Sequence, residues 1–503
     1  MSLRAPLTSA FSSWTYVVVV LFAQCFLHLV LKAIYNIHFH PLRKYPGPWW
    51  LAASRIPHTI SVLRGRATRE SKYLHERYGH VVRINPDTLS FTCSTAWVDI
   101  YGLQQPNGRG NIPKDPLFYL ESRKAPLDAE GHRRLRRTQA YAFSERAVSQ
   151  QEVCLQQYTA FFINRLFESR HNSPSGIIDL AQWINLLTTD IAGDLTLGES
   201  FRGLEDGKIH PWLRNIQWTT KVFAFIRESS RYPGVLRAIG ACCPRNKEDK
   251  QESFIARAVA KRFDMGTDRP DLMSCIIEAA SEGRVSQNEM EAVAVTFLIA
   301  GSETTATLLT GSIYLLCKHP LVMQQLTIIL RTQFRSASEM TLLALQAQDY
   351  LNAVLQESLR LYPPAPGNLF RRTAAEGHIV MGEAVPPNTS LTMNLWAANC
   401  SGLNFYRPDD MVPERWLKSR PAEFEDDDRD VVKPFSMRPH DCPGKNLAWA
   451  EMRLVLAQML WHFDFELTPE SDGWINRQKV FLFWEKPPLK VKITAAARER
   501  PVS

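Results

Sequence analysis

The chain has 503 residues, 45% of them hydrophobic, which is enough to bury a large core in one domain or two, and its formal net charge of +8 favours acidic partners. The basic residues are scattered and no zinc-finger spacing or RNA-binding signature occurs, so we expect no nucleic acid partner. The nine cysteines are irregularly spaced without a CxxC pair, which argues against a structural zinc site and a disulfide framework.

The N-terminal region contains an almost charge-free apolar run from Trp14 to Leu31. Eighteen helical residues span about 27 Å, close to the hydrocarbon thickness of a thin bilayer. More Lys and Arg residues follow the run than precede it, which places the rest of the chain in the cytosol. A cleaved signal peptide is the alternative, but the run is long and no A-x-A site follows. We therefore predict a membrane anchor over residues 1–35.

Three prolines, Pro41, Pro46 and Pro48, follow the apolar run. Proline cannot continue a helix and favours stiff, extended backbone. Residues 36–50 are therefore predicted to form a semi-rigid hinge, with an ordinary linker as the alternative. The catalytic body is then expected over residues 51–503.

The body mixes helical and strand patterns. A helix is predicted over residues 69–78 and a strand over 81–84, and the pattern from about 130 to 360 is mostly helical. After residue 363 the chain becomes rich in loops and strands, with final strands expected at 480–483 and 491–493. The acidic segment 423–430 is expected to be solvated. We predict a mainly α (α+β) fold, a helix-rich body with small β-sheets.

The best-defined helix begins after Ser286, which opens an S-x-x-E capping box, and ends before Pro320. It is apolar almost all round, which predicts that it crosses the interior. Its middle nevertheless carries the polar segment Ala300–Thr305, AGSETT. A carboxylate and three hydroxyls inside a buried helix cost stability, so a functional site is indicated, although waters and backbone could instead satisfy these groups.

A second unusual segment, FSMRPHDCPG, occupies residues 435–444 and precedes a helical run from Lys445 to Leu456. Cys442 lies in a Pro/Gly turn just before the N-terminus of that helix. Helix-end N–H groups and nearby cations lower a cysteine pKa, and a metal deprotonates the thiol outright. This cysteine is therefore a candidate ligand for one iron.

These two segments resemble motifs of the cytochrome P-450 family of haem-thiolate monooxygenases. The central helix matches the oxygen-activating motif, ESLR at 357–360 matches E-x-x-R, PERW at 413–416 matches P-E-R-[FW], and 435–444 matches the cysteine loop. The four motifs occur in the family's order over nearly the whole chain after the anchor. The resemblance implies the cytochrome P-450 fold and heme b (iron-protoporphyrin IX) with an axial cysteine thiolate.

The resemblance assigns roles to individual residues. Cys442 becomes the iron ligand, and Phe435 packs beside its sulfur. Glu303 and Thr304 become the acid and the alcohol that deliver protons over the opposite face of the haem. Cations that bind the haem propionates are expected at His132, Arg136, Arg371 and His440.

Two further features follow from the motifs. Glu357 and Arg360, three residues apart on one helical face, are expected to form a structural triad with Arg415 that locks the cysteine loop. The chain departs from the family at Arg438, where a glycine is usual. We expect the loop to form with a strained backbone at Arg438 and its side chain toward a propionate or solvent.

The activity implied is insertion of one oxygen atom from O₂ into a lipophilic small molecule, in the biosynthesis of a fungal terpenoid, alkaloid or polyketide. Pocket walls are expected at 112–120, 297–300 and 366–370. No flavin or nicotinamide motif occurs, so a separate NADPH-cytochrome P-450 reductase is expected, docked on a basic face with Arg133, Arg134, Arg137 and Lys445. The anchor implies the endoplasmic reticulum membrane. The alternatives are a haem-thiolate isomerase or dehydratase and a non-catalytic haem-binding membrane protein.

Overall fold

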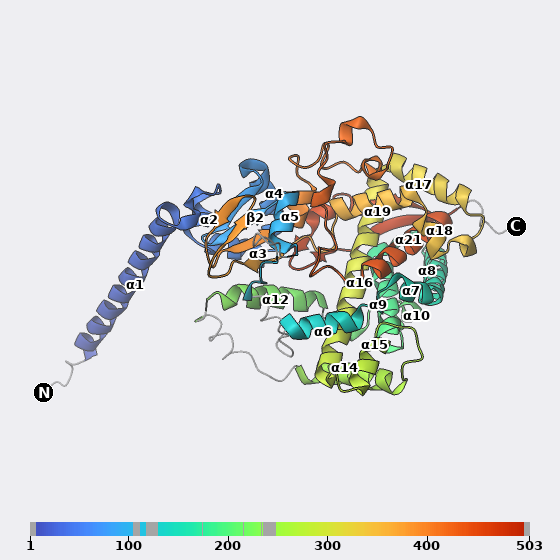
Figure 1. The fold of residues 1–503 in the computed structure, drawn as a ribbon, viewed down its shortest axis with the longest axis horizontal. Coiled ribbons are helices and arrows are strands. Elements are labelled where there is room, and N and C mark those ends of the chain that lie inside the picture. The colour runs from blue at the N-terminus through green and yellow to red at the C-terminus, as the bar shows by residue number, and fades with distance from the viewer. Residues whose placement is uncertain are drawn as a thin grey trace.

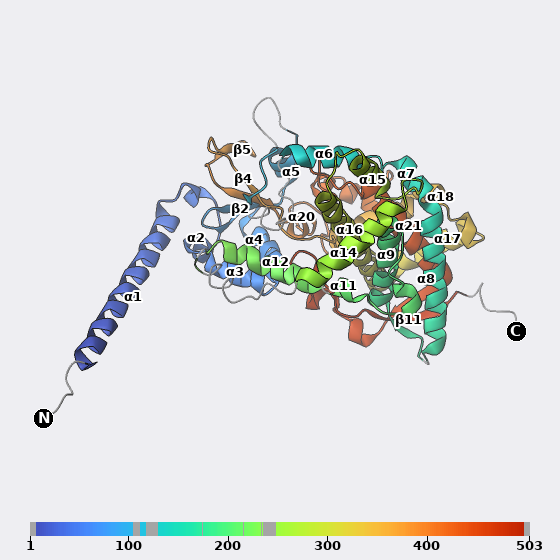
Figure 2. The same ribbon diagram turned by 90° about the horizontal axis from the view of Figure 1, so that it is seen from below.

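The structure is a computed structural model that describes residues 7–103, 111–116, 129–173, 175–214, 216–232, 234 and 248–496. A long N-terminal helix, α1 (Leu7–His38), projects as a rod from a helix-rich body (Figures 1 and 2). Beside the end of α1 lies a part that is rich in strands, and most of the longer helices lie on the far side of the body (Figure 1).

The helices before the central one are α2 (Trp49–Ala53), α3 (Ile56–Leu63), α4 (Ala67–Tyr78), α5 (Ser94–Tyr101), α6 (Ala129–Gln139), α7 (Glu145–Gln150), α8 (Glu152–Asn172), α9 (Leu180–Leu197), α10 (Gly203–Asp206), α11 (Pro211–Arg214), α12 (Ile216–Ser230), α14 (Glu248–Asp264) and α15 (Ser274–Ser281). Of these helices, α9, α14 and α15 pack against the central one. The central helix and its followers are α16 (Gln287–Lys318), α17 (Pro320–Gln333), α18 (Leu342–Gln346), α19 (Asp349–Leu361), α20 (Leu395–Asn399) and α21 (Lys445–His462).

The strands form small sheets. They are β1 (Val81–Asn85), β2 (Thr88–Phe91), β3 (Ile177–Asp179), β4 (Arg371–Arg372), β5 (His378–Val380), β6 (Glu383–Val385), β7 (Ser390–Met393), β8 (Phe463–Leu467), β9 (Lys479–Val480), β10 (Trp484–Glu485) and β11 (Lys490–Ala495). One sheet has the order β1-β2-β7-β4, in which only β2 and β7 are parallel, with Leu89 opposite Leu391. A second has the order β3-β11-β8, and β5-β6 and β9-β10 are two-stranded.

The central helix α16 organises the core. Its capping box forms as expected, because the Ser286 hydroxyl accepts from the Glu289 amide and the Glu289 carboxylate accepts from the Ser286 amide. The helix packs against α9, α19 and α21, and its second half is almost continuously buried. Burial of apolar side chains on all faces is what the sequence pattern predicted.

The sequence-based predictions hold for the main elements and differ at some boundaries. The mainly α fold, the helix near 69–78 and the strand near 81–84 are confirmed. The extended hinge is only partly present, since α1 runs to His38 and the short 3₁₀ helix η1 (Pro41–Lys44) follows. Proline at the first position of η1 is compatible with a helical turn because its missing N–H would have no partner there. The strand expected at 480–483 is wrong beyond Val480, because β9 ends at that residue and β10 begins at Trp484.

Two described helices are long and apolar enough to cross a membrane. The segment Thr15–His38 is 0% buried within the structure, whereas Gln287–Lys318 is 61% buried. The latter is α16, the core helix. The exposed apolar surface of α1, with Phe22 at 78% and Phe26 at 68%, supports a membrane anchor.

Candidate functional site

One face of α16 stays accessible although the helix crosses the core. Thr296 and Ala300 are exposed and Thr304 is half-buried, and these residues recur every four positions on one side of the helix. The intervening residues Phe297 and Leu298 are buried. The Thr304 hydroxyl donates to the Ala300 carbonyl at 2.6 Å. Residues with small side chains therefore form an accessible stripe along the middle of α16.

Glu303, next to Thr304, lies in a different environment. It is 6% exposed and forms an ion pair with Lys486, which follows β10. No hydrogen bond joins the Glu303 and Thr304 side chains, both of which the structure describes. The two residues of the expected acid–alcohol pair are thus adjacent in sequence but held by different partners.

The cysteine loop is fastened by its own backbone. The Cys442 amide donates to the Phe435 carbonyl at 2.8 Å, and the Gly444 amide donates to the Cys442 sulfur. Phe435 packs against the core with its ring 6.3 Å from the Trp449 ring. The Cys442 side chain is accessible, but the protein atoms crowded around it desolvate a charge there and raise the pKa of the thiol, although the Gly444 amide and Arg136 oppose this. In this environment the desolvation outweighs the Gly444 amide and Arg136, so a bound metal, which the sequence-based argument also named, would supply the deprotonation.

A group of cations gathers around His440. Its ring centroid lies 5.2 Å from that of His132, and its buried Nδ1 has no hydrogen-bond partner in the structure. Burial, followed by the charges of Arg371 and Lys114, lowers the pKa of His440 to about 4. Burial and Arg371 also lower the pKa of Lys114. Such a concentration of positive charge calls for an anion.

Arg136 and Arg371 approach this group from different elements. Arg136 of α6 donates to both the carbonyl and the carboxylate of Asp441, each at 2.7 Å, and so also braces the cysteine loop. Arg371 of β4 is buried and donates to the Ile112 carbonyl at 3.3 Å. The structure therefore brings together all four of the predicted propionate-binding residues, since the charges of Arg136 and Arg371 both act on His440.

The residues present fit a haem. The accessible thiol of Cys442 supplies one soft ligand, the cation group supplies partners for two carboxylates, and the Thr296–Thr304 face of α16 leaves room for a flat group. Among the described residues no group of three or more His, Cys, Asp or Glu side chains could hold a bare metal ion. The donor set thus suits an iron already held by a macrocycle.

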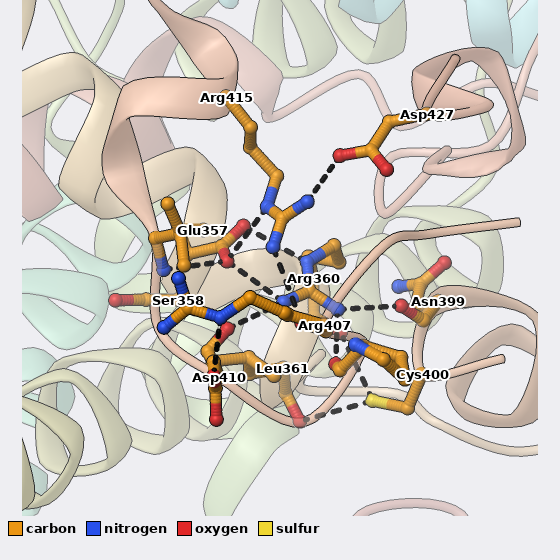
Figure 3. Close-up of polar contacts among 12 residues, drawn as sticks. Glu357, Ser358, Arg360, Leu361, Asn399, Cys400, Arg407, Asp410, Arg415 and Asp427 are labelled. Carbon is orange, nitrogen blue, oxygen red and sulfur yellow. Dashed lines mark hydrogen bonds and ion pairs between the residues drawn. The ribbon is translucent and has the colours of Figure 1, made fainter. Parts of the chain in front are cut away.

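The predicted triad forms and is completely buried (Figure 3). Arg360 donates to both carboxylate oxygens of Glu357, at 2.8 and 2.7 Å, and Arg415 Nε donates to Glu357 Oε1 at 3.1 Å. Burial opposes the charge, but Arg360 and Arg415 hold the pKa of Glu357 below its usual range. Arg360 also donates to the carbonyls of Asn399, Pro408 and Asp410.

The triad fastens the segment 399–427 rather than the cysteine loop itself. Arg415 also pairs with Asp427, which is 8% exposed and accepts from the Tyr406 amide. The prediction that the acidic segment 423–430 is solvated is therefore wrong at Asp427. Arg360 and Arg415 are two buried cations that share one carboxylate, Glu357. Asp427 supplies the second negative charge that balances them.

Sequence reasoning missed two cations of the site, Lys114 and Lys486. Lys114 forms an isolated β-bridge with Arg371, a long-range pairing that sequence periodicity does not report. Lys486 lies in the segment FLFWEKPP, and a pair of opposite charges directly after four mostly aromatic residues was the available signal. Of the predicted pocket walls, residues 117–120 lie outside the described part of the chain.

Comparisons with known proteins agree with this geometry. The cytochrome P-450 family profile matches residues 46–493. The chain is 38% identical to the trichothecene C-15 hydroxylase of Fusarium sporotrichioides, covering 92% of this chain and 95% of that protein. It is 40% identical to the cytochrome P-450 monooxygenase astA of Talaromyces wortmannii (93% and 95% covered) and 36% identical to the averantin hydroxylase of Aspergillus parasiticus (92% and 94% covered).

The fold and the cysteine loop define a haem-thiolate protein, and the matched profile extends from just after α1 to β11. The chain belongs to the cytochrome P-450 family. It is a monooxygenase that uses heme b with an axial cysteine thiolate and a redox partner. The isomerase and the non-catalytic alternatives are not supported, because the relatives carry hydroxylase and monooxygenase names.

Proposed function

We propose that this chain hydroxylates a lipophilic small molecule in fungal secondary-metabolite biosynthesis, at a haem that Cys442 ligates. The observation that carries the proposal is the Cys442 sulfur in a loop braced by Arg136, with the cation group of His132, Arg371 and His440 beside it. When bound, the thiolate-ligated haem supplies the activation of O₂.

The residues around the haem divide the remaining work. Phe435 shields the sulfur from water, and His132, Arg136, Arg371 and His440 neutralise the propionates. Thr304 presents a hydroxyl on the accessible face of α16, and Glu303 supplies protons to it. Support comes from their different surroundings, because Glu303 is buried beside Lys486 whereas Thr304 is half-buried on the accessible face of α16.

The substrate class follows from the relatives and from the apolar walls. The relatives include hydroxylases of a trichothecene and of averantin. Phe297 and Phe370, both predicted as pocket walls, are 6% and 5% exposed. Apolar and aromatic walls with few polar groups favour a lipophilic terpenoid, alkaloid or polyketide.

Membrane attachment and electron supply complete the proposal. Residues 1–35 anchor the chain in the endoplasmic reticulum membrane, 36–50 join the anchor to the body, and 51–503 form the cytosolic catalytic domain. The electrons come from NADPH-cytochrome P-450 reductase. Exposed Arg133, Arg137 and Lys445 support a basic docking face near the cysteine loop, to which Arg134, paired with Glu289, contributes less.

Substitution of the ligand tests the proposal directly. The full chain and Cys442→Ser are purified in detergent, and the reduced, carbon monoxide-bound absorption spectrum of each is recorded. We expect the red-shifted thiolate band in the natural chain and its loss in Cys442→Ser. Metabolites are then extracted from the source organism carrying either the natural chain or Cys442→Ser. The compound that accumulates when Cys442 is replaced is the substrate. A variant that keeps both the band and the oxidised metabolite contradicts the proposal.

A further inference from the structure

Glu303 has a buried partner that comes from a distant part of the chain. The Lys486 amine forms an ion pair with Glu303 Oε1 and donates to Thr307 Oγ1 at 2.6 Å. The Thr307 hydroxyl in turn donates to the Glu303 carbonyl at 2.7 Å. The side chains of Lys486 and Glu303 are only 3% and 7% exposed, so bulk water does not solvate either charge.

Stability alone does not explain this ion pair. A buried pair is often no more stabilising than apolar residues of similar volume, because loss of hydration offsets the attraction between the charges. Aromatic residues, Phe481, Phe483 and Trp484, line a cavity together with Glu303, so this environment is largely apolar. The acidic member of the pair is nevertheless Glu303, the sequence neighbour of Thr304. This position indicates a role in the reaction.

A small cavity reaches Glu303 from the side of α12. Its volume is about 10 Å³, room for about one water molecule. Besides Glu303, its walls are Thr220, Lys221, Phe481, Phe483, Trp484 and Glu485.

The two ion pairs at this cavity differ in exposure. The Lys221 and Glu485 side chains, which pair with each other, are 41% and 32% exposed, against 3% and 7% for Lys486 and Glu303. The Lys221–Glu485 pair therefore marks the solvent end of the cavity, and the Glu303 carboxylate, paired with Lys486, marks its inner end. The walls come from α12 and the C-terminal segment, so the cavity approaches α16 from outside.

We propose that Lys486 is a positioning residue that holds the Glu303 carboxylate toward this cavity, and that the cavity is the inlet by which solvent protons reach Glu303. The inference rests on the proposed role of Glu303. Hydroxylation consumes O₂, two electrons from NADPH and two protons, and releases one oxygen atom as water. Each proton binds to the Glu303 carboxylate at the inlet and neutralises it, which weakens the ion pair with Lys486. The protonated side chain then turns toward Thr304 Oγ1 and passes the proton on, and Thr304 hands on its own proton. Glu303 then returns to the Lys486 amine as a carboxylate.

The fate of O₂ tests the inference without a known substrate. The full-length holoenzyme is reconstituted with NADPH-cytochrome P-450 reductase in phosphatidylcholine vesicles, and NADPH, O₂ and hydrogen peroxide are measured with no substrate added. Slow proton delivery releases O₂ as peroxide instead of water. The peroxide share is the fraction of consumed O₂ that is released as hydrogen peroxide. We expect Lys486→Met and Glu303→Gln each to raise this share about twofold or more. Both variants should also show a larger solvent isotope effect, the ratio of NADPH consumption rates in H₂O and D₂O. Lys486→Arg should restore the natural share because it keeps the cation.

A matched control separates this effect from loss of an ion pair in general. Lys318→Met breaks the exposed Lys318–Asp472 pair at the end of the same helix and should leave the peroxide share unchanged. Thermal unfolding of Lys486→Met, Glu303→Gln and the double variant measures the energetic coupling between the two side chains. The decrease in melting temperature of the double variant should be smaller than the sum of the decreases of the two single variants.

The possible outcomes test the role of Lys486 and the role of Glu303 separately. A raised peroxide share in Glu303→Gln with a natural share in Lys486→Met overturns the role of Lys486 and keeps that of Glu303. A natural share in both variants overturns the proton-relay role of Glu303 itself. Failure of Lys486→Arg to restore the share, together with additive melting losses, reduces Lys486 to a structural residue and also overturns the inference.

Discussion

The left-handed residue of the cysteine loop is Ser436, with a φ of +57°, and Arg438 does not have a positive φ. The sequence led us to expect strain at Arg438, because a glycine is usual there in the family. The structure corrects this expectation, since Arg438 is exposed and its backbone does not require glycine. The cost of about 1 kcal/mol for a left-handed backbone conformation is therefore borne by Ser436 and not by Arg438.

Substitution at Arg438 should consequently have little effect on haem binding. We expect Arg438→Gly to keep the natural ratio of haem to protein and to lose no more than about 1 kcal/mol of stability, because glycine adds freedom to the unfolded chain. Soret absorbance per protein and thermal unfolding measure the two quantities. Ser436→Gly is the matched control and should not lower stability. A rise in haem content in Arg438→Gly would show that Arg438 does distort the loop.

Glu451 of α21 predicts a pH dependence of stability. It is 4% exposed, and its Oε2 has no hydrogen-bond partner in the structure. Burial raises the pKa of Glu451 to about 8, opposed by a hydrogen bond with Thr305. The folded chain thus keeps a proton that the unfolded chain releases above the ordinary carboxyl pKa, near 4.5. The free energy of unfolding should fall by up to about 1.4 kcal/mol for each pH unit between these two values.

Glu451→Gln should remove this contribution. Urea unfolding at several pH values between the two pKa values, for the natural chain and the variant, gives a difference curve that isolates the Glu451 proton. We expect the variant to gain stability relative to the natural chain as pH rises. The exposed Glu423→Gln serves as a control with no such gain. Parallel curves for the natural chain and Glu451→Gln would contradict the assignment.

At the scale of elements, the Glu357–Arg360–Arg415 triad joins α19 to the segment 399–427. Arg415→Met would leave Asp427 buried without its cation and remove one of the two arginines on Glu357. Breaking a buried ion pair in this way costs about 3–5 kcal/mol. We expect a corresponding loss in urea unfolding and in haem retention.

An exposed ion pair in the same region gives the comparison. Arg407 pairs with Asp410, and their side chains are 48% and 52% exposed. Arg407→Met should cost less than about 1 kcal/mol, since water screens exposed pairs. Similar losses for Arg407→Met and Arg415→Met would show that burial of the triad does not determine its contribution.

The elements also show what the sequence could and could not predict. The capping box at Ser286 and the apolar run that follows it depend only on neighbouring residues, so the bounds of α16 were predictable. The pairing of Glu303 with Lys486 joins residues 183 positions apart, and no local pattern encodes it. The burial of Asp427 was missed for the same reason, because a run of acidic residues looks solvated until the cation it faces is known.

At the scale of the whole molecule, α1 is joined to the body through its last turn. Asn36 is 6% exposed, and its side-chain amide donates to the Ala53 carbonyl at 2.9 Å. The Asn36 carbonyl accepts from the buried guanidinium of Arg83 at 3.0 Å. The exposed apolar part of α1 and its attachment to the body are therefore separate segments, which predicts separate effects of two truncations.

A chain that lacks residues 1–32 should leave the membrane fraction and keep the melting temperature of the full chain in detergent, because residues 15–32 form an exposed part of the rod (Figure 1). A chain that lacks residues 1–38 should also lose stability, by about 1–3 kcal/mol, because the buried Arg83 guanidinium loses the Asn36 acceptor. Vesicle flotation and thermal unfolding measure the two effects. Equal melting temperatures for the two truncated chains would show that the last turn of α1 does not hold the body, and flotation of the shorter deletion would place the membrane contact in the body itself.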